Sequence, residues 1–312
     1  MSFFPAAVAK PARRLFAPLL LCALLSAPPA APAGTIGVEH ALGATEAPVN
    51  PKRIVAFDLS VLDSIDALGI TGLDFAVPKQ AMPAYLAKYG SDEALDAGGM
   101  KEPNLEKIYE FRPDVIFISA RQADYHDRFS EIAPTIGPIV DYRDFMPTFR
   151  KCALMLGDLF QVPEAAREQA DAIEAKAAAV AAKAAAGGRN GLIVMVNDGA
   201  VSVYGPGSRF GMIHDILGVP PADPGVEVST HGQSVDFEYL ARIDPDILFV
   251  INRNAAIGSD GASAVLDNEL ILGTKAGRNG RIVRLDSAVW YLAGAGLESL
   301  AIMMDEVDRA LD

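Results

Sequence analysis

The sequence predicts an α/β protein with two similar, Rossmann-like lobes, one long α-helix that joins them, and a ligand cleft between the lobes. Three observations predict this fold: one motif occurs twice, strands alternate with helices in both halves, and an alanine-rich segment separates the halves. Alternating strands and helices are typical of sheets that helices cover. The predicted lobes are residues 34–158 and 189–312, with the connecting helix at 159–188.

The repeated motif occupies residues 104–121, NLEKIYEFRPDVIFISAR, and residues 236–253, DFEYLARIDPDILFVINR. Equivalent positions lie 132 residues apart (253 − 121) without a gap, and they share a Glu, a Pro-Asp pair, an apolar run and an Arg. A unit that is built twice gives two similar lobes. We therefore expect Arg121 and Arg253 to face each other across the space between the lobes.

The first 33 residues have the features of a secretory signal peptide. Three basic residues precede a short apolar run at 15–25, and Ala31-Pro32-Ala33 is a small-x-small cleavage site. The run is shorter than the roughly 20 residues that a membrane-spanning helix needs. The alternative is a lipoprotein anchored at Cys22, but the residue before it, Leu21, is not small. We therefore expect export and cleavage after Ala33.

Composition limits the remaining possibilities. The 312 residues include 40 acidic and 27 basic ones, a formal net charge of −13, so a basic surface for nucleic acid is absent. Without Cys22 only Cys152 remains, which excludes an internal disulfide, and stability must come from a hydrophobic core. With 51% hydrophobic residues the chain can bury enough for two domains. We expect a monomer.

The N-terminal lobe is expected to begin with a strand or hairpin and to continue as a parallel sheet. Ser60 is expected to cap the first helix, and the helix that follows Asn104 must end before Pro113, because the residue before proline avoids the helical region. The unbroken apolar run at 115–119 is typical of a parallel strand that is covered on both faces. The expected elements are a strand or hairpin at 34–52, strands at 53–58, 73–78, 115–119 and 135–142, and helices at 61–69 and 105–111.

The connecting helix is predicted from its composition. Pro163 suits a first helical turn, alanines fill the body, and Gly187-Gly188 ends it. About 24 helical residues would span about 36 Å. The segment could be a surface helix of one domain, but it lies between the two copies of the motif, so we interpret it as a rigid connector that limits the lobes to small rocking motions.

The C-terminal lobe is expected to repeat the alternation. Its expected elements are strands at 192–197, 201–206, 247–252 and 281–286, and helices at 210–217, 236–242, near 263–272 and at 295–311.

Three arginines are candidates for binding an anion. Arg121 and Arg253 each follow an apolar strand, at the end where open α/β sheets bind ligands. Arg209 lies in a Gly/Pro-rich loop, YGPGSRFG. Guanidinium groups are always charged and offer forked donors to oxyanions, so three of them in one cleft suit a ligand rich in anionic oxygens. The alternative is that each is a surface residue paired with a nearby acid.

His231 and Tyr291 are candidate iron ligands. His231 lies in a polar loop, STHGQS, and Tyr291 follows a strand beside Trp290. An imidazole nitrogen and a phenolate oxygen both suit ferric iron, and metal binding favours the deprotonated phenol. The alternatives are a solvated loop histidine and a core aromatic. No catalytic motif is present in the sequence: it has no G-x-S-x-G elbow, Walker loop, H-E-x-x-H or zinc-spaced cysteine pair.

From residue 38 onward the sequence resembles the periplasmic substrate-binding proteins of ferric siderophore ABC importers, and most closely their catecholate-binding branch. The stretches that carry the resemblance include RPDVIFISARQ, YGPGSRFG, STHGQSVDFEYL, INRN and WYLAGAG. The resemblance implies that Arg121, Arg209 and Arg253 contact the anionic complex. It also implies that His231 and Tyr291 fill the two iron positions that a tetradentate siderophore leaves open.

The resemblance further implies that Glu106 and Glu238 dock onto arginines of an inner-membrane permease, one acid per lobe; the alternative is a pair of solvated helix acids. The chain is then expected to work in the periplasm, to carry a ferric siderophore as its ligand, and to need no intrinsic cofactor. The remaining alternatives are a haem or cobalamin carrier of the same fold, and an extracytoplasmic hydrolase with His231 as base.

Overall fold

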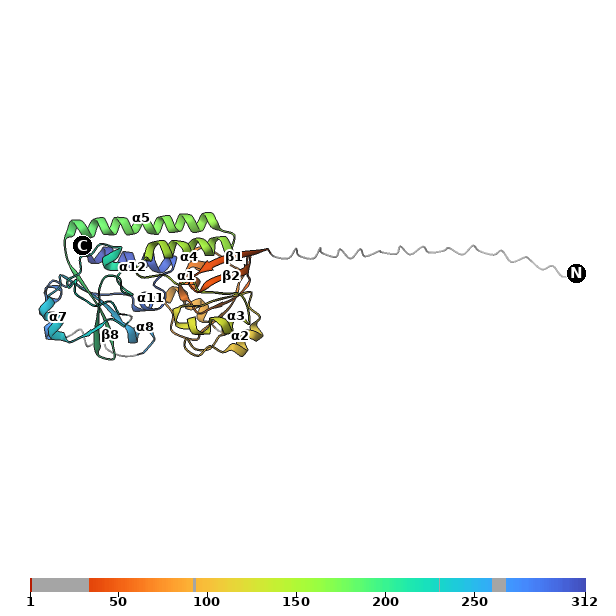
Figure 1. The fold of residues 1–312 in the computed structure, drawn as a ribbon, viewed down its shortest axis with the longest axis horizontal. Coiled ribbons are helices and arrows are strands. Elements are labelled where there is room, and N and C mark those ends of the chain that lie inside the picture. Colours follow the sequence, from red (N-terminus) through yellow and green to blue (C-terminus); the bar gives the residue numbers. More distant parts are fainter. Residues whose placement is uncertain (2–33, 92–93, 230, 260–267) are drawn as a thin grey trace. The chain divides into compact units, whose positions relative to one another are not determined.

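The computed structural model of the chain describes residue 1 and residues 34–91, 94–229, 231–259 and 268–312. The predicted α/β fold with two lobes is confirmed (Figure 1). Each lobe contains a five-stranded sheet, in the order β5-β4-β3-β6-β7 in the N-terminal lobe and β10-β9-β8-β11-β12 in the C-terminal lobe. The predicted signal peptide falls on residues 2–33, which lie outside the described residues.

The N-terminal lobe opens with an antiparallel hairpin and continues with a parallel sheet. Its strands are β1 (Thr35–His40), β2 (Gly43–Pro48), β3 (Arg53–Ala56), β4 (Asp74–Val77), β5 (Leu95–Asp96), β6 (Val115–Phe117) and β7 (Thr135–Ile136). Its helices are α1 (Leu59–Ala67), η1 (Ala84–Gly90), α2 (Leu105–Phe111), η2 (Ala120–Tyr125), α3 (His126–Ser130) and α4 (Phe145–Leu159).

Two predictions for this lobe were wrong, and its longest helix was not predicted. Asp58, not Ser60, caps α1, because the Asp58 carboxylate accepts the Ser60 N–H at 2.9 Å. The strand expected at 135–142 has only two residues, since Gly137 and Pro138 follow them. The 15-residue helix α4 was not predicted, and it packs against the connecting helix.

The C-terminal lobe has a mixed sheet. Strands β8 (Gly191–Asn197), β11 (Ile247–Asn252) and β12 (Ile282–Arg284) are parallel, whereas β9 (Ala200–Tyr204) and β10 (Gln233–Val235) pair antiparallel. Its helices are α6 (Met212–Asp215), α7 (Phe237–Ile243), α8 (Arg253–Ala256), α9 (Glu269–Leu272), α10 (Lys275–Arg278), α11 (Ser287–Leu292) and α12 (Leu297–Ala310). Strand β10 and helices α8, α10 and α11 were not predicted. Part of the helix expected near 263–272 lies outside the described residues.

The 132-residue repeat is visible in the backbone. Helices α2 and α7 begin and end at equivalent residues, and β6 and β11 begin at equivalent residues. Both helices end on a left-handed residue, Arg112 with φ 50° and Asp244 with φ 51°. The Asp of each Pro-Asp pair then accepts a backbone N–H at the start of a neighbouring strand: Asp114 from Arg53 at 2.9 Å and Asp246 from Asn190 at 3.1 Å.

The connecting helix is α5 (Pro163–Gly187), and its 25 residues agree with the prediction. It packs against α4 on the N-terminal side and against α12 at the end of the chain. The largest hydrophobic core includes residues of both sheets and of α4, α5 and α12, so it is continuous from one lobe to the other. A second core lies within the C-terminal lobe and a third within the N-terminal lobe. The domain limits at 34–158, 159–188 and 189–312 stay our proposal.

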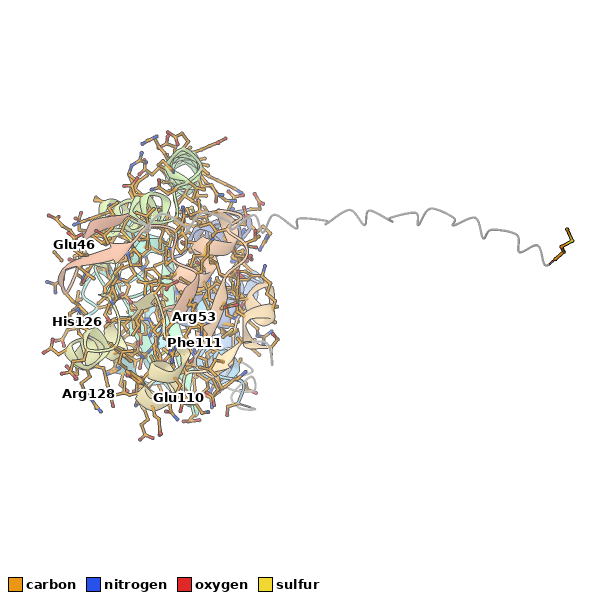
Figure 2. The ribbon with its side chains drawn as sticks, turned by 90° about the vertical axis from the view of Figure 1, so that its right-hand side faces the viewer. Glu46, Arg53, Glu110, Phe111, His126 and Arg128 are labelled. Carbon is orange, nitrogen blue, oxygen red and sulfur yellow. The ribbon has the colours of Figure 1, made fainter. Side chains whose placement is uncertain are left out.

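A cation–π contact joins the start of strand β3 to the end of helix α2 in the first repeat. The Arg53 guanidinium lies 4.5 Å from the centre of the Phe111 ring (Figure 2), and Arg53 Nε donates to the Phe111 carbonyl at 2.8 Å. Strand β3 is thereby tied to the end of α2. The loops at the opposite, carboxyl ends of the parallel strands carry the candidate binding residues.

The close packing of α4 on α5 makes a specific prediction at Gly157. A Cβ there would lie 2.4 Å from the Ala166 Cβ and 3.3 Å from the Pro163 Cα. We expect Gly157→Ala to lower the free energy of unfolding by about 1–3 kcal/mol, because the two helices would have to separate. Urea denaturation measures the change.

Gly187, the last residue of α5, is the matched control, because a Cβ at that position meets nothing within 4 Å. Gly187→Ala should leave stability unchanged or raise it by up to about 1 kcal/mol, since alanine is the better helix former. Equal destabilisation by both substitutions would contradict tight α4–α5 packing as the cause.

Candidate functional site

Three arginines converge on one tyrosine ring. The guanidinium carbons of Arg209, Arg121 and Arg253 lie 4.3, 5.6 and 5.9 Å from the centre of the Tyr291 ring. Arg121 belongs to the N-terminal lobe, and the other three residues belong to the C-terminal lobe. The structure therefore brings together four of the five candidate binding residues, and we call these four the arginine cluster.

The fold places the cluster at the carboxyl ends of parallel strands. Arg121 follows β6, Arg253 follows β11, and Tyr291 lies in α11 after β12. Arg209 comes from the loop between β9 and α6. In open α/β sheets this edge is where ligands bind, because loops from neighbouring strands meet there.

The backbone that carries two of the arginines is fixed by neighbouring amides. Gln122 is buried, accepts the Ser119 hydroxyl at 2.8 Å, and donates to the Met100 carbonyl at 2.5 Å. Asn252 caps α8 by accepting the Ala255 N–H at 3.2 Å. These flanking residues position Arg121 and Arg253 on short helices.

The hydrogen bonds of the cluster join its members to neutral groups. Arg253 Nε donates to the Tyr291 hydroxyl at 3.1 Å, and its Nη1 donates to Asn197 Oδ1 at 2.9 Å. Arg209 donates to the Tyr291 carbonyl. Within the part of the chain that the structure describes, no ion pair joins Arg121, Arg209 or Arg253 to an acid. This absence of described ion pairs favours the candidate anion site over the alternative of arginines paired with nearby acids.

One acid, Asp58, interacts electrostatically with Arg121 of the cluster. Burial raises the pKa of the Asp58 carboxyl, although its hydrogen bonds with Ser60 and the charge of Arg121 oppose this. Its Oδ1 accepts both the backbone N–H and the hydroxyl of Ser60. Among the described residues, no salt bridge joins Asp58 to Arg121, whose charge acts on the carboxyl only over a longer distance.

The cluster makes the Tyr291 phenol more acidic. Partial burial favours the neutral phenol, but the hydrogen bond from Arg253 and the positive charges of Arg209, Arg253 and Arg121 outweigh it. The pKa of Tyr291 is therefore lowered from its usual value of 10.0. Four other tyrosines, among them Tyr204 beside the cluster, have raised pKa values because burial dominates.

His231 lies outside the cluster in this structure. Its side chain is exposed, and its backbone N–H donates to Ser229 Oγ at 3.3 Å. Its neighbour Gly232 passes close to the Tyr204 ring, which stacks edge-on against Phe210 beside Arg209. His231 therefore belongs to a loop near Arg209, but the described contacts do not join its imidazole to Tyr291.

Glu106 and Glu238 are both exposed and occupy the first turns of α2 and α7. They are therefore equivalent in local structure, as the repeat predicts.

Asn197 is the cluster contact that the sequence analysis missed. It ends the apolar strand β8, next to β11 in the sheet, where Val196 pairs with Asn252. Two apolar strands that each end in asparagine, LIVMVN and ILFVIN, were the available signal. Asn197 orients Arg253 without neutralising its charge.

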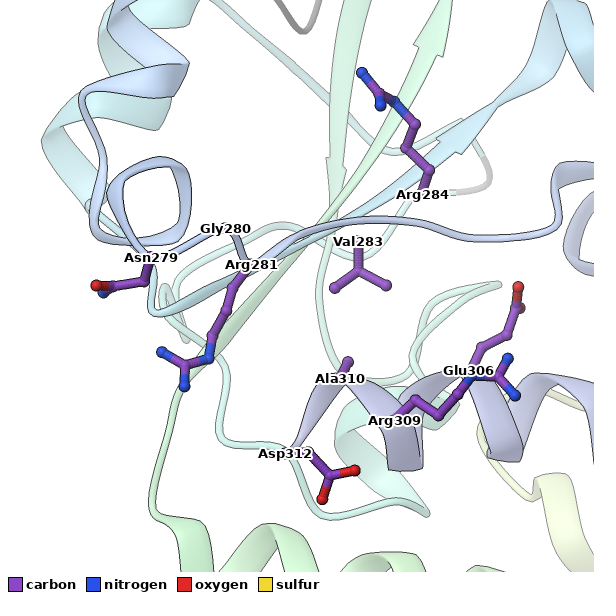
Figure 3. Close-up of a pocket in the computed structure, with 9 residues that line it drawn as sticks. All are labelled: Asn279, Gly280, Arg281, Val283, Arg284, Glu306, Arg309, Ala310 and Asp312. Carbon is purple, nitrogen blue, oxygen red and sulfur yellow. The ribbon is translucent and has the colours of Figure 1, made fainter.

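The two described cavities lie away from the cluster. The larger, about 420 Å³, lies between β12 and the end of α12 and is lined by Arg281, Arg284 and Arg309 among others (Figure 3). The smaller, about 200 Å³, lies beside His40 and Cys152. Since Arg121 reaches the Tyr291 ring, side chains of the two lobes meet at the cluster.

Among the described residues, no three His, Cys, Asp or Glu side chains gather in a way that would hold a metal ion. None of the helices there is long and apolar enough to cross a membrane.

The chain is similar to known proteins in both sequence and structure. Residues 54–289 match the family model described as periplasmic binding protein. The petrobactin-binding protein YclQ of Bacillus subtilis is 42% identical over 89% of this chain and 88% of its own. Its crystal structure superposes with a TM-score of 0.87, covering 89% of this chain and 99% of that one.

Two more relatives agree with this match. The ferric-anguibactin-binding protein FatB of Vibrio anguillarum is 32% identical, covering 87% of this chain and 86% of its own. The crystal structure of the periplasmic catecholate-siderophore binding protein VctP of Vibrio cholerae is 29% identical with a TM-score of 0.81, covering 88% of this chain and all of that one.

The lowered pKa of Tyr291 gives a testable difference between tyrosines. In a spectroscopic pH titration the wild type should form one phenolate below pH 10, and Tyr291→Phe should lose this earliest transition. Because the folded pKa of an acid is depressed, the wild type should also gain stability relative to Tyr291→Phe as pH rises through that pKa towards 10.

Tyr204→Phe is the matched control, because burial raises the pKa of Tyr204 to about 12. That substitution should leave the early transition in place. An early transition that survives Tyr291→Phe would show that the arginines do not act on the Tyr291 phenol.

Proposed function

Since the chain belongs to the family of periplasmic binding proteins, we propose that it binds a ferric siderophore of the catecholate type and delivers it to an inner-membrane ABC permease. The observation that carries the proposal is the arginine cluster: three guanidinium groups without a described acid partner, held around one phenol. The proposed binding residues are Arg121, Arg209, Arg253, His231 and Tyr291.

The charge of the cluster suits this ligand. Six catecholate oxygens carry six negative charges and ferric iron three positive ones, so the complex has a net charge of about −3, which three guanidinium groups match. Hydrogen bonds from guanidinium to anionic oxygen are among the stronger ones in proteins. The chain as a whole is acidic, with a net charge of −13, so its own field opposes the approach of an anion. Local positive charge has to come from the cluster.

The phenol of Tyr291 is suited to ligate iron directly. Arg253 and its neighbours favour the phenolate, which is the form that binds a metal. His231 would supply the second ligand from the loop beside Arg209, where its exposed imidazole is free to turn towards the cleft. We propose that both act when a siderophore leaves two iron positions open, and that neither is needed when it fills all six.

The relatives support the ligand class. YclQ is named for petrobactin, FatB for ferric anguibactin and VctP for catecholate siderophores. The iron is cargo that arrives already chelated, and the protein catalyses no reaction. We further propose that the chain works as a monomer in the periplasm and that Glu106 and Glu238, one on each lobe, dock onto the permease.

A fluorescence titration tests the ligand. The chain has one tryptophan, Trp290, next to Tyr291, so a ferric catecholate in the cleft should quench its emission. Arg121→Ala, Arg209→Ala and Arg253→Ala should each weaken binding about tenfold or more, because each removes a hydrogen bond to a charged group worth about 1.5–3 kcal/mol. Arg167→Ala, which removes an exposed arginine of α5, is the charge-matched control and should not change the dissociation constant.

The same titration separates the iron ligands from the arginines. With a tetradentate ferric complex, Tyr291→Phe and His231→Ala should change the charge-transfer band; with a hexadentate complex they should not. Absence of quenching by every ferric catecholate, together with tight binding of haem, would overturn the proposal in favour of a haem carrier.

Docking has its own test. Glu106→Lys and Glu238→Lys should leave siderophore affinity unchanged but abolish uptake through the permease, because a repelling charge replaces each anchor. Uptake is measured as labelled iron entering proteoliposomes that contain the cognate permease. Glu46→Lys is the charge-matched control, since Glu46 is exposed on β2, away from α2 (Figure 2). Equal loss with Glu46→Lys, or no loss with the other two, would contradict docking by this pair.

A further inference from the structure

A buried carboxylate of the N-terminal lobe holds the start of the last helix. Asp63 in α1 is fully buried. Its Oδ1 accepts the Glu298 N–H at 2.7 Å, and its Oδ2 accepts the Ser299 N–H at 2.7 Å and the Tyr85 hydroxyl at 2.6 Å. Glu298 and Ser299 are in the first turn of α12, so both of these N–H groups lack partners within their own helix.

The residues around Asp63 allow its close contact with the start of α12. A Cβ at Gly296 would lie 2.3 Å from Asp63 Cγ, so only glycine allows the carboxylate to approach. The neighbouring Ser64 hydroxyl accepts the Leu297 N–H at 3.3 Å. Two consecutive side chains of α1 therefore hold three consecutive backbone groups of α12.

The same turn is tied directly to the helix that carries Tyr291. Ser299 Oγ donates to the Ala293 carbonyl at 2.5 Å and accepts the Gly296 N–H at 3.0 Å. Ala293 is the C-cap of α11, and only residues 293–296 separate α11 from α12. A chain of hydrogen bonds thus runs from Asp63 through Ser299 to the end of α11.

Burying a carboxylate costs free energy, and capping a helix does not by itself require one. Burial raises the pKa of Asp63 to about 6, although its hydrogen bonds with Tyr85, Glu298 and Ser299 favour the carboxylate. A neutral serine or asparagine would cap α12 without a buried charge. The carboxylate differs from both in offering two acceptor oxygens at once, which joins two N–H groups of α12 and the Tyr85 hydroxyl at one point.

We propose that Asp63 is a positioning residue for the binding site: from the N-terminal lobe it fixes the start of α12 and thereby the place of Tyr291 relative to Arg121. The inference rests on the function proposed above for the arginine cluster. Asp63 touches none of the residues of the cluster in the described contacts, so it acts through the 293–296 segment.

Asp63→Asn is the principal test. The amide keeps the shape of the side chain but has one acceptor oxygen, so one N–H of α12 loses its partner. We expect the Tyr291 phenolate transition to move back towards pH 10 in the ligand-free protein, and the affinity for a tetradentate ferric catecholate to fall about tenfold, since a loosened support misplaces a binding group. The charge-transfer band should shift as well.

Two variants keep the test decisive. Tyr85→Phe removes the third hydrogen bond to Asp63 and leaves the α12 contacts, so it should change neither the titration nor the band. Ser299→Ala cuts the link to Ala293 while Asp63 keeps its backbone partners, and it should reproduce the shift even if Asp63→Asn fails to fold. Circular dichroism and urea denaturation confirm that the variants compared are folded.

The outcomes are distinct. A Tyr291 transition and band that stay unchanged in folded Asp63→Asn and in Ser299→Ala would overturn the inference and leave Asp63 as a helix cap only. Failure of the wild type to bind any ferric siderophore would overturn the proposed function, while the ligand-free titration of Tyr291 would still decide the role of Asp63.

Discussion

The structure depends on holding three like charges around one ring without acids to neutralise them. Unit charges 4 Å apart in water interact by about 1 kcal/mol, and more where solvent is partly excluded. The cluster counters this repulsion with the face of the Tyr291 ring, with its hydroxyl and carbonyl as acceptors, and with the neutral amide of Asn197. None of these groups cancels the positive charge. The positive charge that remains is what suits the cluster to the anion we propose as its ligand.

The arginines must be held by a rigid part of the fold, because mobile side chains would move apart or form ion pairs with acidic residues. The support is the hydrophobic core that runs from one sheet through α4, α5 and α12 to the other. A single helix between two lobes could act as a loose tether, but here α5 is packed along its length by α4 and α12. Opening the lobes far would expose this core. Small rocking, sufficient to part Arg121 from Tyr291, keeps it buried.

Predictions from the sequence were most accurate where residues close together in the chain determine the structure. The ungapped repeat predicted the bounds of α2 and, to within one residue, those of α7, because Pro-Asp and the cap residues fix backbone geometry within a few positions. Prediction failed where distant contacts decide the structure. Helix α4 owes its place to packing on α5, and strand β10 owes its place to pairing with β9. The grouping of His231 with Tyr291 stays a prediction, because residue type does not fix where a loop side chain points.

The contact of Asp63 with α12 shows why the rest of the site could not be predicted. Asp63 and Ser299 are 236 positions apart, and nothing near either residue indicates the other. The repeat makes the scaffold symmetric, yet the residues around Tyr291 come mainly from the second lobe. The first lobe contributes Arg121, which faces the Tyr291 ring, and Asp63. Asp63 binds the start of α12, which is linked through Ser299 to the end of the helix that carries Tyr291. Arg121 of the first lobe thus contacts the Tyr291 ring, and Asp63 of the same lobe holds the segment that follows α11. In the function we propose, an anion bound at the cluster would join Arg121 of one lobe to Arg209 and Arg253 of the other.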